Sequence, residues 1–365
     1  MILVVNAGSS SIKVELFKLD LTSALSAAVT EIGGAARLKL GDITASVEVP
    51  DHAVALTRVL EALEEQGVSL SDLSAAGHRV VHGGTELTQP TRLTQTVLDQ
   101  IAACIPLAPL HNPHNLTAIQ SLANKMPDLR QFACFDTAFH ASNPAVATTY
   151  ALPEQARSLG LRRSGFHGLS YAALVEHFGD ALPSRLLAFH LGNGASLCAI
   201  LDGKSKATSM GYSPLDGLTM GTRSGAIDGM AVLRLVQEYG LEQTDKILNT
   251  QSGLKGLAGT NDMAELLSRD DDAARFAVDH FCYWAARHAG SAIVAMGGLD
   301  AVAFTGGIGE NAEPIRHNIM QHLSFLGQVP VHVVPADEEK QIARDTLRLL
   351  NAEAPQRDTH RRAST

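Results

Sequence analysis

The sequence predicts an α/β fold made of two related halves. Short apolar runs typical of strands alternate with longer segments that have helical spacing of apolar residues. A strand–turn–strand pattern with glycine in the turn occurs twice, at Gly8 and at Gly192, about half the chain apart. The length of 365 residues exceeds the usual size of one hydrophobic core, which favours two domains.

The first half alternates strands and helices. We expect strands at residues 2–5, 12–18, 75–81 and 131–135, and helices at 54–65, 94–104 and 112–124. Asn112 followed by Pro113 is typical of an N-cap residue and a first helical residue. Asp136 follows the last of these strands, at the end of a strand where open α/β sheets bind ligands.

The second half repeats this order. We expect helices at residues 168–178, 228–239, 273–296 and 337–351, hairpins at 186–208, and a strand at 301–304 followed by a glycine turn at 305–311. Pro314 is a plausible first residue of the next helix. The loop with Asn143 and Pro144 is a candidate domain boundary. The polar tail 356–365 is expected to fray.

Composition narrows the class of protein. The formal net charge of −9 argues against nucleic acid or an anionic membrane as a partner. The four cysteines lie far apart without a C-x-x-C pair, so neither a zinc site nor a disulfide framework is indicated. The N-terminus enters a strand at once, without a basic segment or a long apolar run, which favours a cytoplasmic location.

Three glycine-rich turns carry the functional signal. They lie at residues 6–11, 192–194 and 305–311, each after a strand-like run. Glycine leaves the backbone N–H groups of such a turn accessible, so a phosphate can approach closely. A single turn of this kind is more often an ordinary hairpin, but three of them favour a nucleotide clamp between the halves. None is a Walker A loop, and Gly306, Gly307 and Gly309 lack dinucleotide-binding spacing.

Eight motifs make the chain resemble the acetate kinase family. They are NAGSSSIK (6–13), GHRVVHGG (77–84), APLHNP (108–113), FDTAFH (135–140), GFHG (165–168), HLGNGAS (190–196), MGTRSG (220–225) and FTGGIGEN (304–311). That family belongs to the actin, Hsp70 and sugar-kinase ATPase superfamily. The resemblance implies two duplicated actin-like, ribonuclease H-like domains around a central nucleotide cleft. The domains would be 1–137, joined by a C-terminal helix at about 340–353, and 138–339.

The resemblance also implies a reaction. It is the reversible, direct in-line transfer of the ATP γ-phosphate to acetate, giving acetyl phosphate and ADP. A carboxylic acid is already ionised at neutral pH, since carboxyl pKa values lie near ~4, so no general base is needed. Two anions must instead be held together, and Arg79 and Arg223 suit that task because a guanidinium binds carboxylate and phosphate oxygens.

Further roles follow from the same resemblance. Asp136 is expected to organise Mg²⁺ or Mn²⁺, and His167 and His190 to hydrogen-bond the phosphoryl group in transfer. Asn6 and Glu338 are the expected metal residues. The nucleotide site would comprise Asn6, Ser9, Ser11, Lys13, His190, Gly192, Asn193, Gly194, Asp262, Gly306, Gly307, Gly309 and Asn311. The pocket for the alkyl end of the acid would comprise Val81, Leu110, Phe166 and Pro214, with Arg79 on the carboxylate.

Some positions depart from the family pattern. Ala264, after Asp262, stands where an Arg near the adenine is usual, and Ser164, Leu169 and Ala226 replace other residues typical of the family. The segment 327–331 is also short. Three interpretations stay open: an acetate kinase, a kinase of propionate or butyrate or with another phosphate donor, and a non-catalytic actin-like nucleotide-binding protein. The resemblance further implies a homodimer.

Overall fold

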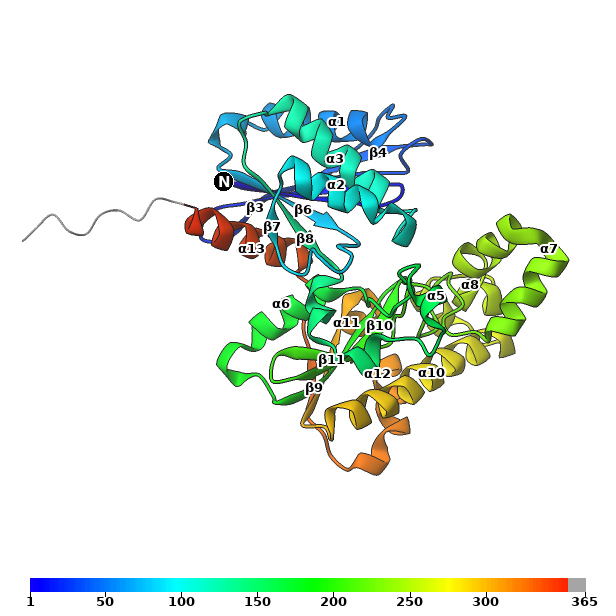
Figure 1. The fold of residues 1–365 in the computed structure, drawn as a ribbon. Coiled ribbons are helices and arrows are strands. Elements are labelled where there is room, and N and C mark those ends of the chain that lie inside the picture. Colours follow the sequence, from blue (N-terminus) through cyan, green and yellow to red (C-terminus); the bar gives the residue numbers. More distant parts are fainter. Residues whose placement is uncertain (354–365) are drawn as a thin grey trace, which may run out of the picture. The chain divides into compact units, whose positions relative to one another are not determined.

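A computed structural model describes residues 1–353, which fall into two compact units. Unit 1 comprises Met1–Phe135 together with the chain from Glu339 onward, and unit 2 comprises Asp136–Glu338. Each unit contains one sheet with helices packed on it, as the ribbon in Figure 1 shows. The α/β class predicted from the alternation of strands and helices is confirmed. No helix within residues 1–353 is both long enough and apolar enough to cross a membrane.

Unit 1 is built on an eight-stranded sheet of order β5-β4-β3-β2-β1-β6-β8-β7. Its strands are β1 (Ile2–Ala7), β2 (Ile12–Phe17), β3 (Ser23–Thr30), β4 (Arg37–Leu40), β5 (Ile43–Ser46), β6 (Ala75–Val80), β7 (Thr91–Arg92) and β8 (Gln131–Phe135). β1 is antiparallel to β2 and parallel to β6, which is parallel to β8. All residues of β1 and β8 are buried, which explains why both read as continuous apolar runs.

Helices cover both faces of this sheet. They are α1 (His52–Glu65), α2 (Gln95–Ala103), α3 (Asn112–Lys125) and α13 (Glu338–Ala352), with 3₁₀ turns η1 (Leu70–Asp72) and η2 (Ile105–Leu107). α1 and α3 pack on one face, where Leu3 and Val5 join the main core, and α13 packs on the other (Figure 1). Gly77 allows this close approach, because a Cβ there would clash with Thr346 of α13.

Unit 2 is built on a five-stranded sheet of order β11-β10-β9-β12-β13. Its strands are β9 (Arg185–Leu191), β10 (Ala195–Leu201), β11 (Lys204–Thr208), β12 (Ala301–Thr305) and β13 (Val331–Val333). β10 pairs antiparallel with β9 and β11, while β12 pairs parallel with β9 and β13. The order β3-β2-β1-β6-β8 of unit 1 has the same sequence of antiparallel and parallel pairs. The two sheets therefore share a topology, which supports the predicted duplication.

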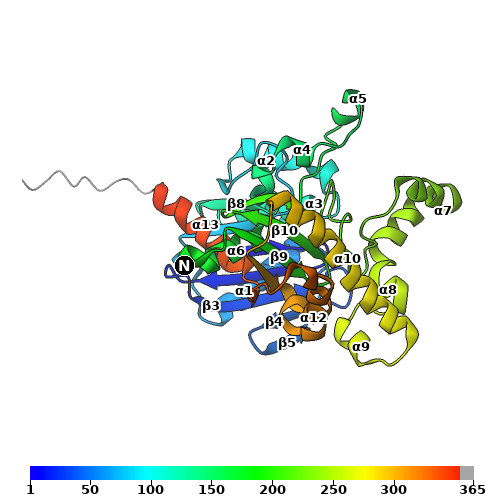
Figure 2. The same cartoon turned by 90° about the horizontal axis from the view of Figure 1, so that it is seen from below.

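The helices of unit 2 vary more in length, from 4 residues in α4 to 25 residues in α10. They are α4 (Ala145–Thr148), α5 (Glu154–Arg157), α6 (Gly168–Phe178), α7 (Gly229–Thr250), α8 (Gly253–Ala258), α9 (Met263–Ser268), α10 (Asp272–Met296), α11 (Gly306–Asn311) and α12 (Glu313–His322), with 3₁₀ turns η3 (Ala138–Ser142), η4 (Gly179–Ala181) and η5 (Ser324–Leu326). Tyr171 and Leu174 of α6 pack on strand residues of the sheet. Figure 2 shows the long helix α10 beside α8 and α9, which it contacts.

Two local predictions need correction, and one lies outside the described residues. Asn112 does not cap α3: His111 is the N-cap, and the Asn112 amide binds the backbone of His82 instead. The glycine segment after β12 is not an open turn but the short helix α11. The helix expected at 228–239 is confirmed as the first part of α7, which is interrupted by a non-helical backbone at Gly240 before a second helical part follows. The predicted fraying of 356–365 falls on residues that are not described.

Candidate active site

The turn between β9 and β10 is the centre of the candidate site in unit 2. It is closed by the Gly192 N–H, which donates to the Gly194 carbonyl over 3.0 Å. A Cβ placed on Gly194 would lie 3.3 Å from His167 Nε2 and 3.7 Å from Arg223 Nη1. The ends of an imidazole and a guanidinium therefore lie against this glycine. The structure thus brings together, within one unit, three of the predicted site elements.

Two histidines form the wall beside this turn. His167 is the N-cap of α6 and has a left-handed backbone, with φ of 58°, which is uncommon for a non-glycine residue. Its Nδ1 lies 2.9 Å from the Ser196 hydroxyl, and its ring centroid lies 4.3 Å from that of His190. His190 Nδ1 lies 2.8 Å from the Ser170 hydroxyl and 3.9 Å from a carboxylate oxygen of Glu338. Each ring is thereby fixed through its Nδ1 atom.

A second layer of hydrogen bonds lies behind His167. The hydroxyl of Tyr171, a fully buried residue, is 2.5 Å from the Ser196 hydroxyl that contacts His167. Burial raises the pKa of Tyr171 well above its usual value, so the phenol stays protonated and can donate. A buried, polar chain from Tyr171 through Ser196 therefore holds the histidine ring.

Asp136 is buried next to the start of α6. It directly follows β8, and its side chain and backbone together are only 1 % exposed. Its carbonyl accepts a hydrogen bond of 2.9 Å from the Gly168 N–H, and a Cβ on Gly168 would clash with that carbonyl. Glycine at 168 therefore allows Asp136 and the His167 corner to approach each other. The sequence motifs that contain these two residues meet here.

The predicted acyl-pocket residues of unit 2 lie beside this cluster. Arg223 Nη1 donates to the Pro214 carbonyl over 3.5 Å, which brings Pro214 to the guanidinium. Phe166 precedes His167 and is 1 % exposed, and its carbonyl lies 2.9 Å from His140 Nε2. Burial lowers the pKa of His140 to about 4, so this histidine is a neutral hydrogen-bonding group at pH 7.

The remaining predicted nucleotide residues of unit 2 occupy three connected segments. Asn193 Oδ1 accepts from Asn261 Nδ2 over 3.0 Å, which ties the turn to the segment before α9. Asp262 caps α9 by accepting from the N–H groups of Ala264 and Glu265, so the departure at Ala264 lies in the first turn of that helix. Gly306 begins α11 with φ of +80°, and Asn311 Nδ2 donates to the Gly307 carbonyl over 2.8 Å.

Gly306 also explains how α11 reaches the β9–β10 turn. A Cβ on Gly306 would lie 2.7 Å from the Leu191 carbonyl, and one on Gly192 would lie 4.0 Å from the Gly307 N–H nitrogen. Gly309 likewise faces Leu191 and Phe304 within ordinary contact distance of a Cβ. The glycines of two predicted nucleotide segments thus lie side by side in unit 2.

Unit 1 contributes a separate cluster around Asn6. Arg79 Nη1 donates to Asn6 Oδ1 over 3.1 Å, and Asn6 Nδ2 donates to a carboxylate oxygen of Glu339 over 3.0 Å. The following turn is closed by the Gly8 N–H, which donates to the Ser11 carbonyl over 2.8 Å, and it includes Ser9. This turn is held from the side by His52, whose Nε2 donates to the Gly8 carbonyl over 2.7 Å.

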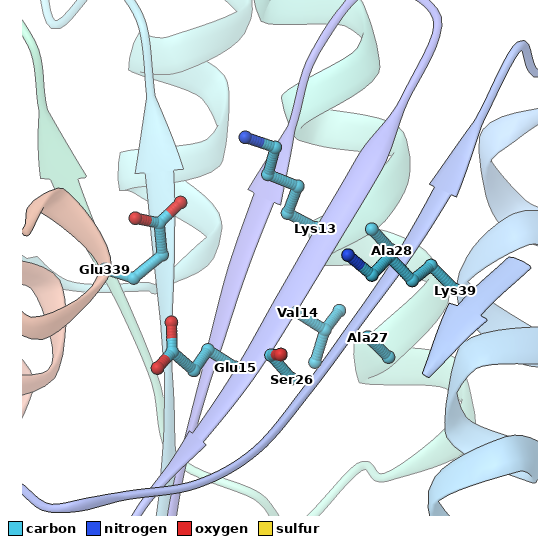
Figure 3. Close-up of a pocket in the computed structure, with 8 residues that line it drawn as sticks. All are labelled: Lys13, Val14, Glu15, Ser26, Ala27, Ala28, Lys39 and Glu339. Carbon is cyan, nitrogen blue, oxygen red and sulfur yellow. The ribbon is translucent and has the colours of Figure 1, made fainter. Parts of the chain in front are cut away.

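A hollow of about 260 Å³ lies on the sheet of unit 1 beside this cluster. Figure 3 shows its lining side chains, which are Lys13, Val14, Glu15, Ser26, Ala27, Ala28, Lys39 and Glu339. Lys13 is thus an exposed cation in a hollow that Glu339 also lines. Of the two acyl-pocket residues predicted in this unit, Val81 is buried, whereas Leu110 is 53 % exposed.

Sequence reasoning missed several residues of these clusters. Ser196 lies inside a quoted motif but was not selected, because a hydroxyl that supports a histidine leaves no pattern of its own. Glu339 lies next to the selected Glu338, and only the fold shows that it is the carboxylate that receives Asn6. Tyr171 lies in an apolar helix face and is indistinguishable there from a core residue.

Comparisons with known proteins identify the family of the chain. The model of the acetokinase family matches residues 1–346. The chain belongs to the acetokinase family. It is 40 % identical to an acetate kinase from Methylocella silvestris, in an alignment that covers 96 % of this chain and 98 % of the relative. The resemblance inferred from the eight motifs is confirmed, and membership makes the chain a kinase with a carboxyl group as phosphoryl acceptor.

Solved structures of the acetokinase family have the same fold. A propionate kinase from Francisella tularensis superposes with a TM-score of 0.90 at 35 % identity, covering 95 % of this chain and 99 % of that one. The acetate kinase of Porphyromonas gingivalis gives a TM-score of 0.88 at 33 % identity, covering 96 % of this chain and 99 % of that one. The whole described architecture, and not one domain alone, is that of the family.

Proposed function

We propose that this acetokinase-family chain is an acetate kinase, which reversibly transfers the γ-phosphoryl group of ATP to acetate. The observation that carries the proposal is the convergence of His167, His190 and Arg223 on the Gly192–Gly194 turn. A glycine turn suits nucleotide phosphates, and hydrogen-bond donors beside it suit a phosphoryl group in transfer. The transfer is direct and in-line, with no covalent enzyme intermediate.

Charge and position supply the proposed catalysis. The acetate carboxylate is already ionised, so the chain needs no group to remove a proton. Arg223 and the two histidines stabilise the charge on the transferring phosphoryl group, as donors in phosphoryl-transfer sites generally do. Arg79 binds the acetate carboxylate, and its hydrogen bond to Asn6 fixes one edge of the guanidinium.

We further propose Mg²⁺ or Mn²⁺ as cofactor. Residues 1–353 contain no group of three His, Cys, Asp or Glu residues that would hold a metal by themselves. Mg²⁺ usually binds one or two protein oxygens together with substrate phosphates and waters, so that donor set still fits. Asn6 and Glu338 would each supply an oxygen ligand to the ion. Asp136 would orient the ion through the water molecules bound to it. When bound, the ion neutralises phosphate charge. Support comes from the burial of Asp136 and from the contact between Glu338 and His190.

Propionate is the second candidate substrate. It is favoured by the Francisella tularensis propionate kinase, which matches as well as the acetate kinases do. Val81, Leu110, Phe166 and Pro214 would surround the alkyl group, and one methylene changes binding in such a pocket by only about 1–3 kcal/mol. Acetate remains the proposal because curated relatives such as the Methylocella silvestris protein are named acetate kinases.

Trapping the acyl phosphate as a hydroxamate tests the proposal. The purified chain is incubated with ATP, Mg²⁺ and acetate, propionate or butyrate, and the hydroxamate is measured. Acetate is expected to give the highest kcat/KM. A higher value with propionate or butyrate would reassign the substrate. A folded chain that binds ATP and forms no acyl phosphate from any of the three acids would instead be a non-catalytic nucleotide-binding protein.

A homodimer in the cytoplasm completes the proposal. Association is supported by apolar side chains that α7 exposes, among them Met230 at 71 % and Leu241 at 75 % exposure. The net charge of −9 supports small anionic metabolites, held by local cations, rather than nucleic acid as the ligands. Light scattering coupled to gel filtration measures the mass directly, and a mass near 38.6 kDa would contradict the dimer.

A further inference from the structure

The strands that carry Asn6 and Arg79 part from each other at these two residues. β1 and β6 pair in parallel from Ile2 opposite Ala75 to Val5 opposite His78, and no further. Asn6 and Arg79 follow directly, and their side chains hydrogen-bond to each other over 3.1 Å. Beyond this point β1 continues beside β2 and β6 continues beside β8. A gap between diverging parallel strands is where open α/β sheets bind ligands.

One buried amide spans this gap. Asn115 belongs to α3, which contacts both β1 and β6, and it is 1 % exposed. Its Oδ1 accepts from the Val81 N–H over 3.1 Å, and its Nδ2 donates to the Ala7 carbonyl over 2.8 Å. The Val81 N–H is a donor just beyond the end of β6, and the Ala7 carbonyl is an acceptor at the end of β1. Because buried backbone groups need partners, the amide takes the place of the strand pairing that has ended.

We propose that Asn115 is a positioning residue that fixes the spacing of β1 and β6 and thereby the Asn6–Arg79 pair. The inference rests on the proposed function, since it assigns Arg79 to the acid substrate. Asn115 acts through the backbone, from the face that α1 and α3 cover. Glu339, which receives Asn6, belongs to α13 on the opposite face (Figure 1). Asn115 therefore sets the spacing of the strands from one face, and the Arg79–Asn6–Glu339 chain of hydrogen bonds depends on that spacing on the other face.

The chemistry requires an amide at this position. One short planar group must accept from one strand and donate to the other, and the carboxamide of Asn does both at neutral pH. Asp is isosteric and retains the acceptor for Val81, but a carboxylate oxygen would face the Ala7 carbonyl without a hydrogen. Asn115→Asp therefore removes one of the two contacts and keeps the size of the side chain.

The chain offers a matched control in the same helix. Asn112 is 0 % exposed and also binds a backbone with both ends of its amide, accepting from the His82 N–H and donating to the His82 carbonyl. His82 belongs to the chain that follows β6. The Asn112 Nδ2 also donates to the carbonyl of Ile101 in α2. Asn112→Ala thus removes buried hydrogen bonds of α3 that are comparable to those of Asn115. It leaves the Asn115 bridge between β1 and β6 in place.

Steady-state kinetics tests the positioning role. Asn115→Ala and Asn115→Asp should raise the KM for acetate and lower kcat by about tenfold, because misplacing a binding group slows transfer. The KM for ATP should stay within about threefold, since a positioning effect is specific to the substrate that Arg79 holds. Asn112→Ala, compared at equal fractions folded, should keep both acetate constants within about threefold. Equal losses in Asn112→Ala and Asn115→Ala would reduce Asn115 to a stability residue and overturn the inference.

A double-mutant cycle links Asn115 to Arg79. If Asn115 acts through Arg79, Asn115→Ala should add about threefold or less to the defect of Arg79→Ala, because coupled residues are not additive. A full additional tenfold loss would mean independent roles and would overturn the inference.

Amide hydrogen exchange provides a readout that needs no turnover. The Val81 amide should exchange about tenfold faster in Asn115→Ala than in the unmodified chain, because its acceptor is gone. Unchanged exchange of the Val81 amide in an active enzyme would overturn the Asn115 bridge between β1 and β6, but not the proposed function. An unmodified chain that forms no acyl phosphate would overturn the proposed function, and with it the kinetic part of the inference.

Discussion

The ring of His167 lies against the ring of His190, with centroids 4.3 Å apart and planes inclined by 35°. Each ring is held by a different hydroxyl, from Ser196 and Ser170 respectively. These hydroxyls orient the two rings, and His167 Nε2 lies towards Gly194 of the β9–β10 turn. His167 therefore presents its Nε2 edge to the turn.

The first prediction concerns the hydroxyl behind His167. Tyr171→Phe removes the 2.5 Å contact with Ser196 and leaves that serine free to rotate away from His167. We expect kcat to fall by about tenfold, a size typical of a lost supporting contact, with the KM for ATP little changed. Steady-state kinetics with varied acetate and varied ATP measures both constants.

Tyr150→Phe is the control for Tyr171→Phe. Tyr150 also uses its hydroxyl in unit 2, where it accepts from the Tyr212 N–H over 3.0 Å, and its ring lies under the Arg163 guanidinium. We expect this variant to keep the kcat of the unmodified enzyme. Identical kcat values in Tyr171→Phe and the unmodified enzyme would show that the buried hydroxyl does not support His167.

The second prediction concerns the space beside Gly194. In Gly194→Ala the new methyl group would lie 3.3 Å from His167 Nε2 and 3.7 Å from Arg223 Nη1, so the imidazole must shift by a few tenths of an ångström. We expect kcat to fall by about tenfold, because small displacements of catalytic groups slow transfer. ATP binding, measured by calorimetry, should weaken as the methyl group narrows the turn.

Gly290→Ala provides a glycine control for Gly194→Ala. Gly290 lies within α10, and apart from its chain neighbours and the nearby backbone of its own helix, no atom of the described residues lies within 4 Å of a Cβ built there. Alanine is favoured over glycine inside a helix by about 1 kcal/mol, so this variant should be slightly more stable and equally active. Normal turnover in Gly194→Ala would show that the phosphoryl group does not pass between the turn and His167.

The third prediction concerns the two guanidinium groups. Arg79→Ala and Arg223→Ala should each lower kcat by about 100-fold, the usual cost of removing a donor that stabilises transition-state charge. ATP binding, measured by calorimetry, should change far less than turnover. Arg234→Ala is the control, since Arg234 is an exposed residue of α7 paired with Glu238 on the same helix. Near-normal acetate turnover in both active-site variants would contradict the proposed roles.

The sequence predicted the strands and long helices well because their signals are local. The hairpin from β9 to β10 was predicted because glycines separate two apolar runs, and α6 and α10 because apolar residues recur at helical spacing. Helix α11 was missed because Gly306, Gly307 and Gly309 disfavour helix formation, although the helix begins directly after β12. Asn112 was misassigned because an Asn before Pro looks the same whether it caps its own helix or binds a neighbouring loop.

The candidate site was only partly predictable for a related reason. Asn6 and Glu339 are 333 residues apart in sequence, so no local pattern indicates their hydrogen bond. Asn115 is likewise invisible, because its function depends on the point at which β1 and β6 stop pairing. Motifs identify the residues that face a substrate, whereas the residues that hold them emerge only from the fold.

The last prediction concerns acid stability through His140. Burial lowers its pKa to about 4 in the folded chain, from an ordinary value of 6.5, and its two ring nitrogens contact Ser205 and the Phe166 carbonyl. Below pH 6.5 the unfolded chain binds a proton that the folded chain does not, so unfolding becomes more favourable as the pH falls. The stabilising effect of the neutral ring is complete above that pH. It is lost progressively towards pH 4, at a total cost of about 3 kcal/mol.

Urea titrations between pH 7 and about 4.5 measure this effect as the slope of the unfolding free energy against pH. His140→Gln should be less stable than the unmodified chain at pH 7, because buried contacts are lost. Its unfolding free energy should depend less steeply on pH, by an amount that corresponds to at most one proton taken up on unfolding. His317→Gln is the control, since His317 is exposed and contacts only a neighbouring glutamine of its own helix among the hydrogen bonds described. Equal slopes in His140→Gln and the unmodified chain would mean that His140 takes up its proton alike in the folded and unfolded states, which its buried position next to Phe166 argues against.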